Sequence, residues 1–184
     1  MTKLTELETW WGAIERQLGD RRLTIALLVV AASGALGIAV ACEIGVRVFN
    51  TDWNQVFGYT AQRDRGAMPF FTLWIGTTLA PLLQGLVGGT LTKVYAAPPR
   101  PYHWQRAMAV AIVGSIPMYV AGLSLIFLPG IMLFAIAFVV SCGWWASGNR
   151  GLLGLKYSES PEHVAVSLLI SGGLLLLVSA SIPS

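Results

Sequence analysis

The chain has 184 residues, of which 55% are hydrophobic and 11% are charged, and its formal net charge is +3. A soluble domain usually carries about 25% charged residues, because its surface must be hydrated. The composition therefore excludes an ordinary soluble enzyme, and the small, scattered positive charge excludes nucleic-acid binding. It indicates an all-α integral membrane protein.

Two long segments without charge support this interpretation. The first, residues 107–149, contains 43 residues, and the second extends from residue 163 to the C-terminus. A helix as long as the first segment would measure roughly 65 Å, at about 1.5 Å per residue. The hydrocarbon core of a bilayer is only about 30 Å thick, so this segment must turn back once. Leu128-Pro129-Gly130 predicts the turn, because Pro and Gly in sequence interrupt a helix.

The first predicted element is an amphipathic helix within residues 1–22. Apolar residues recur there at three- and four-residue spacing from Leu4 to Leu18, which places them on one helical face. Trp10 and Trp11 belong to this segment, and tryptophan is enriched at headgroup depth. We expect a cytoplasmic helix that lies flat in the membrane interface with both tryptophans as anchors. The alternative is a frayed cytoplasmic tail.

Residues 23–184 are predicted to form a transmembrane domain of five helices. A helical span needs about 20 predominantly apolar residues. The five predicted spans cover residues 24–48, 69–95, 105–127, 131–147 and 161–182.

The distribution of Lys and Arg predicts the orientation of these spans. With a cytoplasmic N-terminus, the inner segments hold nine basic residues: Lys3, Arg16, Arg21, Arg22, Lys93, Arg100, Arg106, Arg150 and Lys156. The outer segments hold three: Arg47, Arg63 and Arg65. This bias predicts the N-terminus inside and the C-terminus on the outer side. Trp104, Trp144 and Trp145 are then expected as anchors at the inner interface.

Three polar side chains inside the predicted spans are candidates for chemistry, since such groups are costly in a membrane. Glu43 stands four residues before Arg47, so the two can pair on one helix. They form either an ion pair that reaches the outer surface or a proton or cation site. Gln84 lies near the middle of the second span, just after Pro81. Its amide either forms hydrogen bonds that hold helices together at a packing kink or is part of a substrate site.

Glycine and proline positions predict where helices pack closely or bend. Small residues four apart let helix backbones approach each other, and proline removes a backbone donor. The expected packing and kink positions are Gly37, Gly45, Pro81, Gly85, Gly89, Pro117, Gly122, Pro129 and Gly143.

We predict no catalytic residues, no metal site and no cofactor. The chain contains none of the short nucleotide-binding, zinc-protease or serine-hydrolase motifs. Cys42 and Cys142 lie inside apolar runs and are not spaced as a disulfide framework or a metal knuckle. His103 and His163 flank the predicted spans, where we expect them without a ligand. The alternative is a haem or metal held by both.

The second half of the chain resembles a known family. Within residues 106–182 it has Pro117, then the sequence MYVAGL at 118–123, Pro129, and a Gly-rich segment at 148–154. In this order the chain resembles the Yip-domain (Ypt/Rab-interacting protein) family, and most closely its bacterial inner-membrane branch. The resemblance implies a five-helix membrane protein without enzymatic activity, and in eukaryotic members a role in vesicle trafficking through Rab-type GTPases.

Eukaryotic Yip-domain proteins usually have a long cytoplasmic N-terminal region for such contacts. Only 22 residues precede the first predicted span, so we do not expect GTPase binding. The sequence predicts a non-enzymatic scaffold or accessory protein of a bacterial inner (cytoplasmic) membrane, which binds lipids, other membrane proteins or itself. One alternative is a small transporter or channel that uses Glu43 and Gln84. Another is an accessory subunit of a multi-subunit redox or energy-transducing complex.

Overall fold

The computed structural model describes residues 10–48, 68–95, 100–127 and 129–180, and the regular elements in this part of the chain are all helical. The six α-helices that the structure delimits are α2 (Arg21–Val48), α4 (Met68–Leu91), α5 (His103–Gly114), α6 (Ile116–Gly122), α7 (Gly130–Gly148) and α8 (Glu159–Ala180). A 3-10 turn, Leu123–Ile126, follows α6, and a π-helical turn, Asn149–Leu153, follows α7. The predicted all-α class is confirmed.

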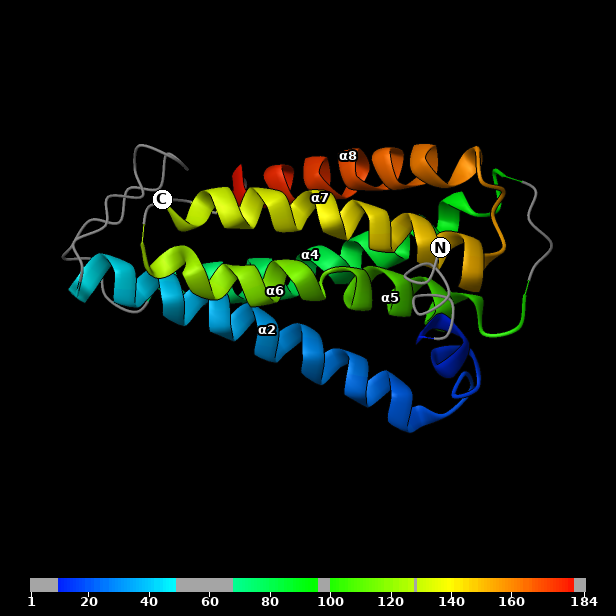
Figure 1. Cartoon of the computed structure of the whole chain (residues 1–184), viewed down its shortest axis with the longest axis horizontal. Coiled ribbons are helices and arrows are strands. Elements are labelled where there is room, and N and C mark those ends of the chain that lie inside the picture. The colour runs from blue at the N-terminus through cyan, green and yellow to red at the C-terminus, as the bar shows by residue number, and fades with distance from the viewer. Residues whose placement is uncertain (1–9, 49–67, 96–99, 128, 181–184) are drawn as a thin grey trace.

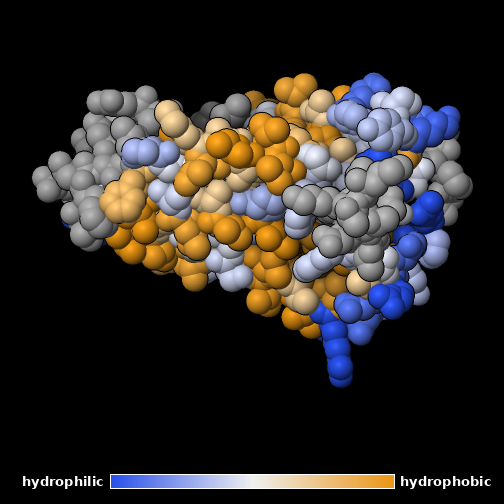
Figure 2. All heavy atoms as spheres, viewed as in Figure 1, coloured by the Kyte–Doolittle hydropathy of each residue, from blue (hydrophilic) through white to orange (hydrophobic). Residues whose placement is uncertain are grey.

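The helices form one elongated bundle and alternate in direction along the chain, except that α6 continues in the direction of α5 (Figure 1). α4 contacts α2, α5 and α8, and α7 contacts α5, α6 and α8. The first turn of α2 contacts α5, where the Gln105 amide donates to Thr24 Oγ1 at 2.9 Å, and α2 approaches α6 toward its C-terminal end (Figure 1). Hydrophobic side chains cover the middle of the bundle, and hydrophilic ones gather at the end where α5 and α8 begin (Figure 2). We refer to that end as the polar end.

Four helical segments of the described chain are long and apolar enough to cross a membrane, fewer than the five spans that the sequence predicts. They are Arg21–Arg47, Phe70–Leu91, His103–Ile126 and Gly130–Leu153. The fifth predicted span, 161–182, falls on α8, which is not among the four. α8 begins with an acidic turn containing Glu159 and Glu162, and the predicted end of the span lies outside the described residues.

The third predicted span is a broken helix, because Pro117 has no backbone donor. α5 ends at Gly114, and the backbone N–H of Ser115 bonds to Ile112 O, three residues back, at 3.1 Å. That shift leaves the carbonyl of Ala111 without its usual partner. The Ser115 hydroxyl donates to this carbonyl at 2.7 Å, so the break is satisfied locally.

The Gly-rich segment 148–154, which is part of the family resemblance, is largely helical. α7 continues into the π-helical turn, and Gly154 follows it in the left-handed region at φ 75°. The N–H of Leu155 then bonds back to Asn149 O at 3.1 Å, as in a glycine-terminated helix. Because a π turn holds an extra residue, it changes the direction of the side chains around Asn149.

The N-terminal helix packs on the bundle, and only one of its two tryptophans is exposed. Residues 1–9 are outside the described chain, but residues 10–15 are helical. Trp10 is 63% exposed, whereas Trp11 is 3% exposed and belongs to the main hydrophobic cluster. The Glu15 carboxylate accepts a bond from the buried Arg106 guanidinium at 2.8 Å, which ties this helix to α5.

Candidate functional site

Besides the acidic residues of its first turn, α8 carries a buried polar face. The side chains of this face recur every three or four residues, and each is at most 4% exposed: Ser160, His163, Ser167 and Ser171. An otherwise apolar helix with one polar face directs that face toward other protein groups. The sequence interpretation missed this stripe, although its spacing was visible, because it assigned His163 to the membrane interface.

His163 is the centre of this buried polar region. Its Nε2 lies 2.9 Å from Gly88 O of α4, and its Nδ1 lies 3.0 Å from the Asn149 side-chain nitrogen in the π turn. The Asn149 amide nitrogen can only donate, so Nδ1 accepts and Nε2–H donates to Gly88 O. The ring is therefore a neutral imidazole that joins three helical elements.

His103, at the start of α5, binds the neighbouring carbonyl of α4. Its Nε2 lies 2.7 Å from Gly89 O. Carbonyls near the end of a helix have spare acceptor capacity, and the two histidines use it at the C-terminal end of α4. Gly88 O also accepts the Thr92 N–H at 3.1 Å, so His163 binds its second lone pair. A Cβ on Gly88 would lie 3.3 Å from His163 Cε1, and one on Gly89 would lie 2.8 Å from the Trp104 ring.

Replacing His163 by Phe is expected to lower the free energy of unfolding by roughly 2–3 kcal/mol. The aromatic ring fits the space, but the amide of Asn149 loses its acceptor and Gly88 O loses a side-chain donor. Thermal unfolding in detergent micelles measures the change, with His163→Gln as a partial rescue. Thr90→Val is the control, since that exposed hydroxyl bonds only within its own helix. Equal stability of His163→Phe and the wild type would contradict the assigned bonds.

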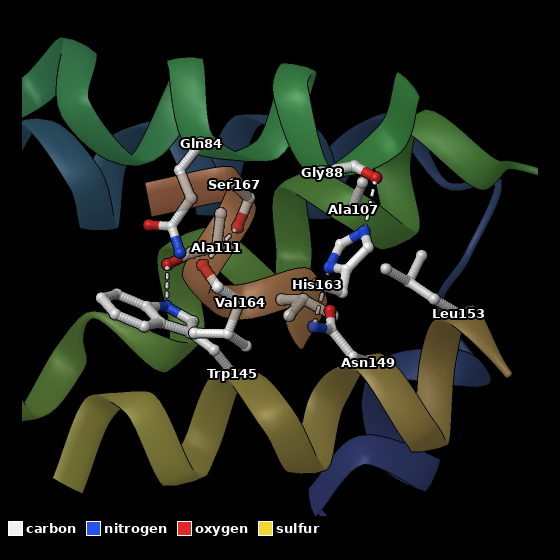
Figure 3. Close-up of a pocket in the computed structure, with 11 residues that line it drawn as sticks. Gln84, Gly88, Ala107, Ala111, Trp145, Asn149, Leu153, His163, Val164 and Ser167 are labelled. Atoms are coloured by element: carbon white, nitrogen blue, oxygen red, sulfur yellow. Dashed lines mark hydrogen bonds between the residues drawn. The ribbon is translucent and has the colours of Figure 1, made fainter. Parts of the chain in front are cut away.

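A small cavity lies next to this histidine, between α4, α5, α8 and the end of α7 (Figure 3). Its volume is about 10 Å³, and its polar lining comes from Gln84, His163, Asn149, Ser167 and the indole of Trp145. The apolar part of its lining includes Ala107, Val110, Ala111, Leu153 and Val164.

Gln84 faces this cavity and is 8% exposed. Its amide has no hydrogen-bond partner among the described residues. The helix around it is continuous, because α4 runs through Pro81 without a break. The nearby threonine hydroxyls, Thr77 and Thr78, donate to Leu73 O and Trp74 O. Gln84 is thus a cavity residue, with no role in closing a proline kink.

The other intramembrane candidates lie elsewhere. Glu43 and Arg47 form an ion pair in the last turns of α2, where both side chains are partly exposed. Neither lines the cavity, so the structure does not bring Glu43 and Gln84 together in one site.

The predicted packing glycines face another helical element, with one exception. A Cβ on Gly37, Gly45, Gly85, Gly89 or Gly122 would press against Leu123, the Ile126 carbonyl, Met108, Trp104 or Ile38 respectively. Pro129 is the N-cap of α7, which confirms the predicted turn there. A Cβ added to Gly143 would meet no atom of the described residues within 4 Å, so this glycine faces outward on the chain.

The predicted tryptophan anchors divide into exposed and buried residues. Trp104 is 44% exposed at the polar end, and Trp144 is half-buried against the hydrophobic cluster. Trp145 is 2% exposed, contrary to its predicted place at the interface. The reason is the Ala111 carbonyl at the α5 break, which accepts a second side-chain donor, Trp145 Nε1, at 3.0 Å beside the Ser115 hydroxyl.

The described residues contain no group of three or more His, Cys, Asp or Glu side chains arranged to hold a metal ion. His163 uses both ring nitrogens in hydrogen bonds to the protein, and His103 uses its Nε2. The arrangement is suited to joining helices, and within the described part of the chain the Gln84 amide is the polar side chain at the cavity that makes no hydrogen bond to the protein. In comparisons with known proteins, no protein-family model, curated protein or solved structure matches the chain.

Proposed function

We propose that the chain is a non-enzymatic integral membrane protein that acts as a scaffold or accessory protein, by binding lipids and other membrane proteins through its outer helix faces. The observation that carries this proposal is the apolar outer surface of the bundle. On α7 alone, large side chains with exposed fractions from 40% to 71% follow one another: Met132, Leu133, Ile136, Phe138, Val139 and Val140. An apolar surface of this extent requires lipid or protein contact.

The polar interior supports a structural role over a catalytic one. His163, His103 and Trp145 each bond to a backbone carbonyl of another helix. Groups that hold helices together in this way are not poised for proton transfer to a substrate. The resemblance to the Yip-domain family, with its bacterial inner-membrane branch, agrees with this proposal and does not extend it to GTPase binding.

We further propose that α8 is a fifth membrane helix. It lies alongside α4 and α7 and runs in the direction opposite to α7 (Figure 1). After Glu162, its exposed side chains among the described residues are apolar, including Leu169 at 76% and Leu177 at 67%. Five crossings place the two ends of the chain on opposite sides, with a cytoplasmic N-terminus.

The topology is testable with reporters fused after residue 184. A periplasmic alkaline phosphatase fusion is expected to be active, and a green fluorescent protein fusion to be dark, in a bacterial inner membrane. Both reporters fused at the N-terminus serve as the matched control and should give the opposite pattern. The same pattern at both ends would show an even number of crossings and would rule out α8 as a span.

The scaffold role is tested by cross-linking and mass spectrometry in the native membrane, followed by purification in mild detergent. We expect defined protein neighbours or retained lipids. Variants with Lys at Ile136 and at Val139, on the exposed face of α7, should lose those neighbours while the bundle stays folded. A lone, lipid-free monomer from native membranes would count decisively against the proposal.

Transport is the second candidate, and the cavity at Gln84 is the observation that favours it. Polar groups that line a space inside a membrane bundle are typical of solute pathways. Solute flux into liposomes would be compared for the wild type, Gln84→Leu and Glu43→Gln. Flux in the wild type that only Gln84→Leu abolishes would favour transport through the cavity; no flux in any of the three would exclude it.

A further inference from the structure

We propose that the cavity beside Gln84 is a binding site for one neutral, water-sized molecule that both donates and accepts hydrogen bonds, namely a single water. This inference is independent of the scaffold role, because it concerns the interior of the bundle. It rests on the side chain of Gln84, the volume of the cavity and the chemistry of its lining.

The Gln84 amide makes no hydrogen bond to the described protein atoms, so its donors and its acceptor are available at the cavity. Its side chain offers two donors and one acceptor. It is 8% exposed and faces the cavity from α4. A buried amide left unpaired is strongly unfavourable compared with one that is hydrogen-bonded. A bound molecule that can donate as well as accept satisfies this side chain.

The size of the cavity restricts the ligand to a water-sized molecule. Its volume is about 10 Å³, and a cavity needs roughly 10–15 Å³, measured in the same way, to hold one water. A larger solute, such as an amino acid or a sugar, does not fit without movement of the surrounding helices.

The chemistry of the lining favours a neutral molecule. The residues that line the cavity include no Asp, Glu, Lys or Arg, so an ion would lack a counter-charge. The donors of His163 and Trp145 are used on Gly88 O and Ala111 O. Ser167 Oγ donates to Val164 O at 2.9 Å, which leaves its oxygen lone pairs as acceptors.

A water in this position bridges α4 to α8. The water accepts a hydrogen bond from the Gln84 amide and donates one to Ser167 Oγ. The bond from His163 to Gly88 O already joins α8 to α4, and the water joins the same two helices again one helical turn away. Ser167 stands four residues after His163 on the same face of α8, which places both side chains at the cavity (Figure 3). Buried waters usually make two to four such bonds.

A double-mutant cycle tests the bridge. Gln84→Leu and Ser167→Ala each remove one partner of the water, so the double variant should lose less thermal stability than the two single losses combined. We expect a difference of roughly 2–6 °C from additivity. Gln84→Leu combined with Thr90→Val is the matched control, and it should be additive because Thr90 is exposed and bonds only to its own helix.

A direct measurement on the wild type keeps the proposal testable even where a variant does not fold. In nanodiscs, protein labelled with ¹⁵N-glutamine should show a nuclear Overhauser effect between water and the Gln84 amide, and the Gln84→Leu spectrum assigns that signal. Additive behaviour in the cycle, or absence of the water contact in the wild type, would overturn the proposal. A rise in melting temperature for Gln84→Leu would do the same, since it would mean that the amide is simply unpaired.

Discussion

Replacing Trp11 by Ala is expected to lower the free energy of unfolding by about 3 kcal/mol, as for other large-to-small changes at buried aromatic positions. The Trp11 side chain is 3% exposed and lies against Gly148, the last residue of α7, and Gly151 of the π turn. A Cβ on Gly148 would be 2.9 Å from Trp11 Cζ2, and one on Gly151 would be 3.4 Å from Trp11 Cβ. Truncation leaves a void there and weakens the docking of the whole N-terminal helix.

Trp10→Ala is the matched control, because that neighbouring tryptophan is 63% exposed. It should change the free energy of unfolding, measured by thermal unfolding in detergent, by less than about 1 kcal/mol. The loss of docking in Trp11→Ala should also speed tryptic cleavage at Arg16 in folded protein. Equal cleavage rates and equal stability of the two variants would mean that the N-terminal helix is not held by Trp11.

Replacing Gly114 by Ala is expected to lower the free energy of unfolding by about 2–3 kcal/mol, because the added methyl group would overlap the indole of Trp145. The indole sits against the last residue of α5 and donates to Ala111 O at 3.0 Å. To make room it must move away, and the carbonyl then loses one of its two side-chain donors. The stability is measured by thermal unfolding in detergent.

Gly143→Ala provides the comparison for this substitution. Gly143 also lies in a helix, but a Cβ there meets nothing within 4 Å among the described residues. Alanine has a higher helix propensity than glycine, so this control should be neutral or slightly stabilising in the monomer. Similar losses for Gly114→Ala and Gly143→Ala would contradict the tight contact between α5 and Trp145.

The polar end of the bundle contains a buried charged side chain as well as solvated ones. Arg106 is 7% exposed, yet its guanidinium donates to Pro101 O, Leu152 O and the Glu15 carboxylate. Through these bonds the Arg106 guanidinium holds together three segments: the loop before α5, the π turn and the N-terminal helix. A buried cation is tolerated only when such acceptors surround it.

The sequence by itself determined the helical class and the approximate limits of the apolar segments. These follow from local rules: apolar runs of sufficient length form helices in a membrane, and Pro129 with Gly130 ends one and starts the next. The predicted close approach at Gly37, Gly45, Gly85, Gly89 and Gly122 also agrees with the structure, because small side chains admit neighbouring backbones.

Only the tertiary structure decided which aromatic and polar groups are buried. Trp145 is inside because the Ala111 carbonyl, at the break before Pro117 on a different helix, accepts a hydrogen bond from its indole. His163 is inside because the Gly88 carbonyl of α4 accepts a hydrogen bond from its Nε2–H. A sequence pattern predicts which side chains share a face of one helix. It does not predict which backbone carbonyls of another helix can accept a hydrogen bond from them. Trp10 and Trp11 are adjacent and of one type, and only the glycines of a distant segment distinguish them. Burial at these sites depends on partners far away in the chain, and those partners meet only in the folded bundle.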